Sequence, residues 1–209
     1  MSGTLTPGSS ATPSPGGVTA GFYGKLPARG DFVRAGLPRE FTDPWDDWLQ
    51  SVIAGSQSIM GEAWLPAYLE APIWRFALPP GMCGSLAALG LMLPSVDKAG
   101  RYFPLTFAAL RTGGWAASSG EAWLARCEAA GLSALEEDTL PQEISAMIGT
   151  PDLLDEAVAS RDAEWWSEGS SRVDPTRMTL RCLPDAATYA IMLEGDTSAR
   201  GESRWESTS

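Results

Sequence analysis

The sequence predicts a single α/β domain in three layers, with a mixed, largely antiparallel central sheet and helices on both of its faces. Its 209 residues, of which 44% are hydrophobic, suffice for one domain with a sizeable core. Three short apolar segments, 73–78, 85–93 and 102–110, indicate an antiparallel meander. A run of apolar residues at helical spacing before them predicts a helix with one apolar face. An α+β arrangement with one open face is the alternative.

Composition divides the chain into three segments. Residues 1–18 consist mainly of Gly, Pro, Ser and Thr, so they cannot offset the entropy of ordering and are expected to form a disordered leader. Residues 19–194 form the globular domain, and residues 195–209 a flexible tail. The leader lacks the basic and apolar regions of a secretory signal. The longest uncharged stretch, 76–96, is broken by prolines and glycines, so direct membrane insertion is not expected.

The first elements follow from turn residues and periodicity. A strand is expected at 21–26, followed by a loop rich in Gly and Pro. A helix then begins with Asp43 as its cap and Pro44 at its first position. Its apolar face consists of Trp45, Trp48, Leu49, Val52 and Ile53. Most tryptophans are expected in the core, because an aromatic ring buries a large area.

The second half of the chain is predicted in less detail. Ser118 and Glu121 form a capping-box pattern before a helical run that Gly131 weakens. A further helix is expected at 151–160. Two late segments, 178–183 and 188–193, are too short for periodicity to distinguish strand from helix.

Charge and composition exclude several classes of function. The chain has no histidine, so Ser-His-Asp and Cys-His catalytic groups are absent. Its net charge is -11, and the excess acid lies in residues 112–209, so nucleic acid is an unsuitable partner. Three widely spaced cysteines predict neither a disulfide framework nor a zinc site. Runs of neighbouring carboxylates are interpreted as solvated faces, and no metal or cofactor is expected.

A glycine and a lysine after the first strand resemble part of a phosphate loop. That motif requires a glycine five positions before Gly24 and Ser or Thr after Lys25, but the chain has Thr19 and Leu26 there. The structural alternative is that Gly21 and Gly24 allow a bend or close packing of the backbone, with Lys25 solvated.

Two charged loops are candidates for a binding surface. Arg29 and Asp31 flank Gly30, where they could pair with each other or face a partner. Asp97, Arg101 and Tyr102 occupy a second turn between two predicted strands. A folded sheet could bring both loops to one edge; an ordinary solvated turn is the simpler reading of each.

Four ordered blocks resemble one bacterial family. They read GFYGKLPARGDF at 21–32, WDDWL at 45–49, YLEAPIWRF at 68–76 and PSVDKAGRYFPL at 94–105. In order and spacing they are similar to the type VI secretion system-associated protein TagF, also called ImpM. The resemblance covers about residues 21–110, and Glu164-Trp165-Trp166 resembles a later family element.

The resemblance implies a cytoplasmic accessory protein that represses assembly or firing of the secretion apparatus after translation. The implied partners are components of that apparatus, including the FHA-domain scaffold protein Fha. No catalytic residue is expected. The residues in the family blocks that suit a polar interface are Lys25, Arg29, Asp31, Asp97, Arg101 and Tyr102. The alternatives are a stoichiometric structural component of the apparatus and a small carboxylate-dependent hydrolase.

Overall fold

The computed structural model describes residues 17–116, 118–151 and 160–196. Seven strands form one sheet in the order β2-β1-β5-β4-β3-β6-β7, and every pairing among them is antiparallel. The strands are β1 (Thr19–Gly24), β2 (Val33–Ala35), β3 (Trp74–Leu78), β4 (Ala87–Leu93), β5 (Leu105–Arg111), β6 (Ala163–Ser167) and β7 (Thr176–Leu180). The largely antiparallel α/β domain is therefore confirmed, although the described strands include no parallel pair.

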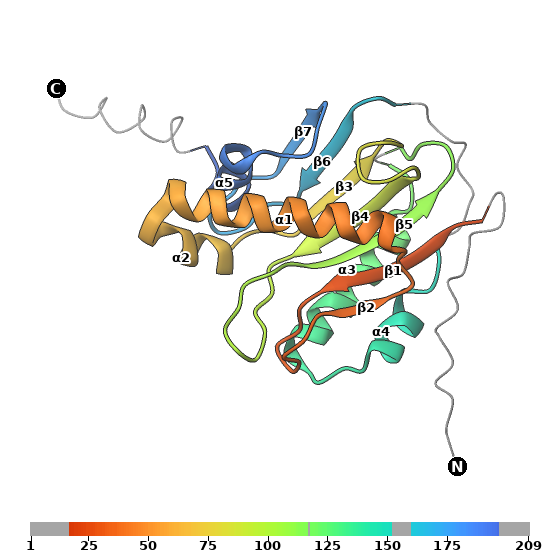
Figure 1. Cartoon of the computed structure of the whole chain (residues 1–209), viewed down its shortest axis with the longest axis horizontal. Coiled ribbons are helices and arrows are strands. Elements are labelled where there is room, and N and C mark those ends of the chain that lie inside the picture. Colours follow the sequence, from red (N-terminus) through yellow and green to blue (C-terminus); the bar gives the residue numbers. More distant parts are fainter. Residues whose placement is uncertain (1–16, 117, 152–159, 197–209) are drawn as a thin grey trace, which may run out of the picture.

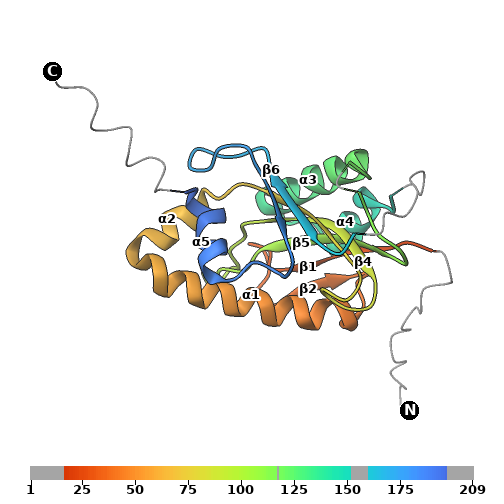
Figure 2. The same ribbon diagram turned by 90° about the horizontal axis from the view of Figure 1, so that it is seen from above.

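Helices cover both faces of the sheet, as the three-layer prediction requires (Figures 1 and 2). One face carries α1 (Arg39–Met60), α2 (Trp64–Leu69) and α5 (Ala186–Glu194), with a short 3-10 turn, Gly61–Ala63, between the first two. The other carries α3 (Glu121–Glu136) and α4 (Pro141–Ile148). Strands β4 and β5 are buried along their whole length because they lie between these two layers.

The core beneath α1 is rich in aromatic rings. Trp45 is fully buried and packs against Phe41, Phe76 and Trp165, with ring centroids 5.4, 4.8 and 6.2 Å away. Its indole Nε1 donates a hydrogen bond to Thr106 Oγ1 at 3.0 Å, which links the helix to the central strand β5. The expectation that most tryptophans lie in the core is confirmed; the buried ones are Trp45, Trp64, Trp74, Trp115, Trp123, Trp165 and Trp166.

Two predicted helix starts are wrong. Helix α1 begins at Arg39, one turn before the proposed Asp43 cap, and Pro44 lies inside it. The extra turn is held by the Pro38 carbonyl, which accepts bonds from the amides of Phe41 and Thr42, and by burial of the Phe41 ring. Helix α3 begins after Gly120, whose left-handed backbone replaces the proposed Ser118 cap.

Helix α3 continues through Gly131 because tertiary packing outweighs the low helix propensity of glycine. A Cβ at Gly131 would lie only 3.0 Å from a Leu93 methyl and 3.1 Å from the Phe107 ring. The glycine therefore allows α3 to approach the sheet closely.

The late and short elements differ most from the predictions. Strands β2 and β6 and helices α2 and α4 were not predicted, whereas the two undecided late segments are the strand β7 and the helix α5. The helix predicted at 151–160 lies mostly in residues 152–159, outside the described residues, as do nearly all of the predicted leader and tail. None of the described helices combines the length and apolar character needed to cross a membrane.

Candidate functional site

The sheet topology brings the two charged loops together. Strands β1 and β4 both pair antiparallel with β5, so their carboxyl ends lie at the same end of the sheet. The loop of residues 25–32 follows β1 and the loop of residues 94–104 follows β4, and both project from the lower end of the sheet in Figure 1. We call these two loops the two-loop surface. The predicted juxtaposition of the charged loops is therefore present.

A buried ion pair joins the loops. Lys25 Nζ lies 2.5 Å from Asp97 Oδ2, and the two side chains are only 5% and 0% exposed. The structural alternative of a solvated Lys25 is thus wrong, because the lysine turns inward against the neighbouring loop. Neither side chain can offer a large contact area to a partner, so any contribution of theirs to binding is to hold the loops in position.

The Asp97 carboxylate has a full set of donors. Besides the bond from Lys25, it accepts hydrogen bonds from Arg101 Nε at 2.7 Å and from the backbone amides of Ala99 and Arg101 at 2.9 Å each. The hydrogen bond from Lys25, supported by these others, holds the pKa of Asp97 well below its usual range even though burial acts in the opposite direction. The carboxylate therefore stays ionised and organises the tip of its loop.

Further bonds fasten one loop to the other. The Arg101 guanidinium donates to the Gly30 carbonyl, and the amide of Lys98 donates to the Arg29 carbonyl at 3.3 Å. Ser95 Oγ donates to the Lys25 carbonyl at 2.7 Å. The loops thus form one hydrogen-bonded unit, which lowers the entropy that a partner would have to remove on binding.

The remaining predicted residues differ in exposure. The Arg101 side chain is 60% exposed and Asp31 is also exposed, whereas Tyr102 packs edgewise on Trp64 and Tyr68 with centroids 5.5 and 5.7 Å away. The Arg29 guanidinium lies 3.2 Å from Asp138 in the α3–α4 connection. It therefore does not make the local ion pair with Asp31 that was one of the two sequence alternatives.

Sequence reasoning did not single out Phe32, the last residue of the first loop of this surface. Its ring is 43% exposed, stacks on Tyr23 at 5.3 Å and meets Phe103 edge-on at 4.8 Å. Lys25 Nζ, which pairs with Asp97, also lies 4.5 Å from the centroid of the Phe32 ring, within the range of a cation–π contact. A large apolar residue next to charged loop residues was the available signal. Lys98, at the exposed tip of the second loop, was also left out.

Gly24 fixes the place where the first loop leaves the sheet. Its φ is +147°, and a Cβ there would lie 2.3 Å from the Pro104 carbonyl oxygen. This confirms the expectation that Gly24 allows close backbone packing. A Cβ at Gly21 would also be too close, 2.0 Å from the Ala35 carbonyl oxygen.

Replacing Gly24 with alanine should therefore destabilise the fold by about 2 kcal/mol or more, because both the backbone angle and the contact become strained. Urea unfolding of the variant measures this effect. Gly30→Ala is the matched control, since a Cβ there meets nothing within 4 Å, and it should change stability by less than about 1 kcal/mol. Equal stabilities for the two variants would contradict the packing argument.

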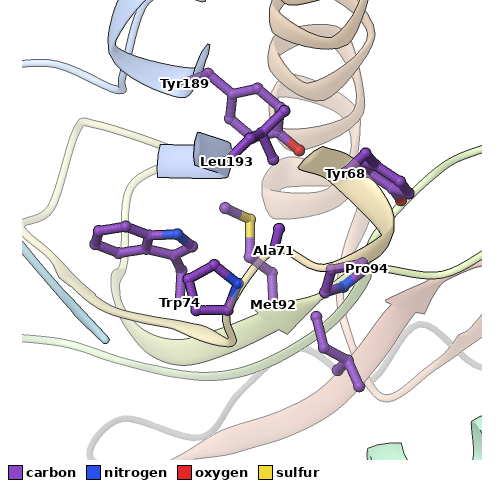
Figure 3. A pocket seen from close by; sticks show the side chains of 9 residues that line it. Tyr68, Ala71, Trp74, Met92, Pro94, Tyr189 and Leu193 are labelled. Carbon is purple, nitrogen blue, oxygen red and sulfur yellow. The ribbon is translucent and has the colours of Figure 1, made fainter. Parts of the chain in front are cut away.

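Two cavities lie near the sheet and α3, and neither supports a small-molecule site. A cavity of about 10 Å³ between α2, α5 and the sheet is lined by apolar groups, including Ala71, Trp74 and Met92 (Figure 3). It holds at most one water, so it belongs to the core.

A hollow of about 290 Å³ beside α3 is lined by two carboxylates, Glu121 and Glu168, together with Arg75. Arg75 lies 3.2 Å from Glu168, whose side chain is 79% exposed. This is a solvated surface pair rather than a pair of carboxylates held in a dry pocket. No group of three or more potential metal ligands occurs among the described residues.

Comparison with known proteins now identifies the family. A family model described as TagF N-terminal domain, type VI secretion system-associated, matches residues 21–150, which is more than half of the chain. The chain belongs to the TagF family. The matched range extends from β1 through α4 and contains both loops of the two-loop surface.

A solved structure supports the same assignment for the TagF fold. The crystal structure of PA0076 from Pseudomonas aeruginosa PAO1 superposes with a TM-score of 0.73 at 36% sequence identity. The alignment covers 85% of this chain and 95% of PA0076. Among curated proteins, no sequence gives a significant match.

Proposed function

We propose that this TagF protein represses the type VI secretion system by binding a component of the apparatus, without catalysing a reaction. The observation that carries the proposal is the two-loop surface, where the buried Lys25–Asp97 pair holds an exposed Arg101 and its neighbours in one arrangement. The FHA-domain scaffold Fha is the partner that the family resemblance implies. Sequestering that scaffold would shift the assembly equilibrium by mass action.

The chemistry of the surface suits a protein partner. Exposed Arg101, Lys98 and Asp31 provide charges of both signs around the exposed ring of Phe32. Arginine and aromatic residues are enriched at the centres of protein interfaces, and charged rims set orientation and association rate. Because the loops are already bonded to each other, binding requires little reorganisation of this protein.

The repressor proposal is tested by secretion of the apparatus's tube protein into the medium. Cells that lack this chain should secrete more than normal cells, and cells that overproduce it should secrete less. Loss of secretion on deletion would instead indicate a required structural component, and unchanged secretion in both strains would refute regulation. Purified Fha then tests the partner separately by direct titration.

Charge reversal at the loop tip should weaken partner binding. Lys98→Glu and Arg101→Glu should each raise the dissociation constant by about tenfold or more, which corresponds to 1.4 kcal/mol. Calorimetric titration with Fha measures the change, with Arg39→Glu at the exposed start of α1 as control.

The two variants separate surface charge from loop structure. The Lys98 side chain makes no hydrogen bond or ion pair among the described residues, whereas Arg101 bridges to Asp97 and Gly30. If only Arg101→Glu weakens binding, the loop geometry matters and the charge itself does not contact Fha. If both variants remain folded and bind normally, the two-loop surface is not the contact site.

A further inference from the structure

Strand β7 forms one edge of the sheet, at the far end from β2 and the two-loop surface (Figure 1). It pairs with β6 over five residues, from Ala163 opposite Leu180 to Ser167 opposite Thr176. No described strand pairs with its other side. In an edge strand, alternate residues direct their backbone N–H and C=O groups outward, so β7 offers a ready template for another extended segment.

Three arginines lie along this edge or at its end, in a chain whose net charge is -11. Arg177 is 57% exposed, with its guanidinium 5.4 Å from the centroid of the Trp166 ring and 3.1 Å from Glu164. Arg181 directly follows the strand, and Arg161 approaches from the start of β6. Within the described residues, neither Arg161 nor Arg181 forms an ion pair.

An open hollow continues the edge at this end of β7. Its volume is about 540 Å³, and both Arg161 and Arg181 line it together with the β3–β4 turn at 79–82. The exposed Cys182 and the half-buried Leu183 complete its wall. One end of a strand paired with β7 would therefore lie near this hollow. Its two arginines have no carboxylate partners among the described residues.

We propose that β7 is a docking edge for an extended acidic segment of a partner protein. The segment adds an eighth strand to the sheet through backbone hydrogen bonds, and its carboxylates pair with Arg161 and Arg181 in the hollow. This inference concerns a second surface and does not depend on the repressor role assigned to the two-loop surface.

Charge favours this occupant over a second copy of the chain. A second copy of β7 would bring another Arg161, Arg177 and Arg181 to an edge that already carries these three arginines, and this added positive charge opposes the association. An acidic segment instead supplies the opposite charge. The strongly negative protein repels such a segment elsewhere, so the local arginines must decide where it binds.

Cys182 provides a reporter next to the hollow, because Cys83 and Cys127 are buried. The probes are ten-residue peptides of alternating valine and glutamate, each with a terminal cysteine carried as its thionitrobenzoate disulfide. Attack by the Cys182 thiolate forms the protein–peptide disulfide and releases coloured thionitrobenzoate, which gives the rate. Matched peptides replace glutamate with threonine or lysine, and a fourth carries N-methyl groups at alternate residues of the acidic sequence.

With the full chain, the acidic peptide should react about tenfold faster than the lysine peptide. The Arg161→Glu/Arg181→Glu double variant should abolish this preference. Each rate is divided by the rate of the threonine peptide with the same variant, so that a change in the reactivity of the Cys182 thiol cancels. Arg34→Glu/Arg39→Glu should preserve it. N-methylation should slow the reaction, and the tethered acidic peptide should slow amide hydrogen exchange in residues 176–180.

Three results would overturn the proposal. Equal rates for the acidic and lysine peptides would remove the charge argument. A charge preference without slowed exchange or an effect of N-methylation would show that the arginines attract anions but that no strand is added. Slow exchange in residues 176–180 of the peptide-free protein, together with a dimer in sedimentation, would assign the edge to a second copy.

Discussion

Replacing Trp45 with alanine should lower the free energy of unfolding by about 3–5 kcal/mol. The indole is fully buried between helix α1 and the sheet, where it contacts four other aromatic rings. Truncation would leave a large cavity and would also leave Thr106 Oγ1 without its indole donor. Since domains of this size are stable by only about 5–15 kcal/mol, this loss is a large fraction of the total.

Urea unfolding followed by circular dichroism measures the change. Trp45→Phe keeps most of the ring but removes the Nε1 donor, and it should cost about 1–2 kcal/mol. Leu69→Ala serves as a surface control, because Leu69 is 54% exposed and its truncation should change stability by less than about 0.5 kcal/mol. A Trp45→Ala variant as stable as the Leu69→Ala variant would contradict the assignment of Trp45 to the core.

The central fold could be predicted because local patterns agree with the final packing. The segments that became β3, β4 and β5 are apolar and bounded by turns, so their strand character appears in the sequence itself. The peripheral elements lacked such agreement. Strand β2 has only three residues, and α5 is nearly uniformly apolar, so neither carries a periodic signal that tells strand from helix.

The sequence suggested that the two loops could meet, but it predicted neither the strand pairing that joins them nor the roles of their residues. The first strand lay outside the predicted meander, and its pairing with β5, which β4 also flanks, places Arg29 and Asp97 at one end of the sheet. Which charged side chain turns inward depends on contacts 72 positions apart, such as Lys25 with Asp97. Sequence periodicity carries no information on such pairs, and lysine is usually found at the surface.

Replacing Asp97 with asparagine should strongly destabilise the protein at neutral pH and loosen the two-loop surface. The change removes the only carboxylate paired with the buried Lys25 ammonium among the described residues. A buried charge without its partner is costly, because neither water nor a counter-ion solvates it. The loss should exceed that of Glu164→Gln, which breaks the exposed pair with Arg177.

The pH dependence distinguishes this ion pair from simple packing. Because Lys25 and the other donors lower the pKa of Asp97 in the folded state, its contribution to stability is fully present above the unfolded pKa of about 3.9. That contribution is lost as the pH falls further towards the folded value, where the carboxylate takes up a proton. The stability difference between the normal protein and Asp97→Asn should therefore be constant from pH 7 to 5 and shrink below pH 4.

Urea midpoints collected between pH 3 and pH 7 provide this difference. Lys25→Met should be less harmful than Asp97→Asn, because Asp97 would keep Arg101 and two backbone amides as donors, whereas Lys25 would keep no carboxylate. Adding Lys25→Met to Asp97→Asn should then restore part of the lost stability, since the unpaired cation is gone. A stability difference that does not change with pH, or a double variant weaker than both single variants, would mean that shape complementarity rather than charge holds the two loops together.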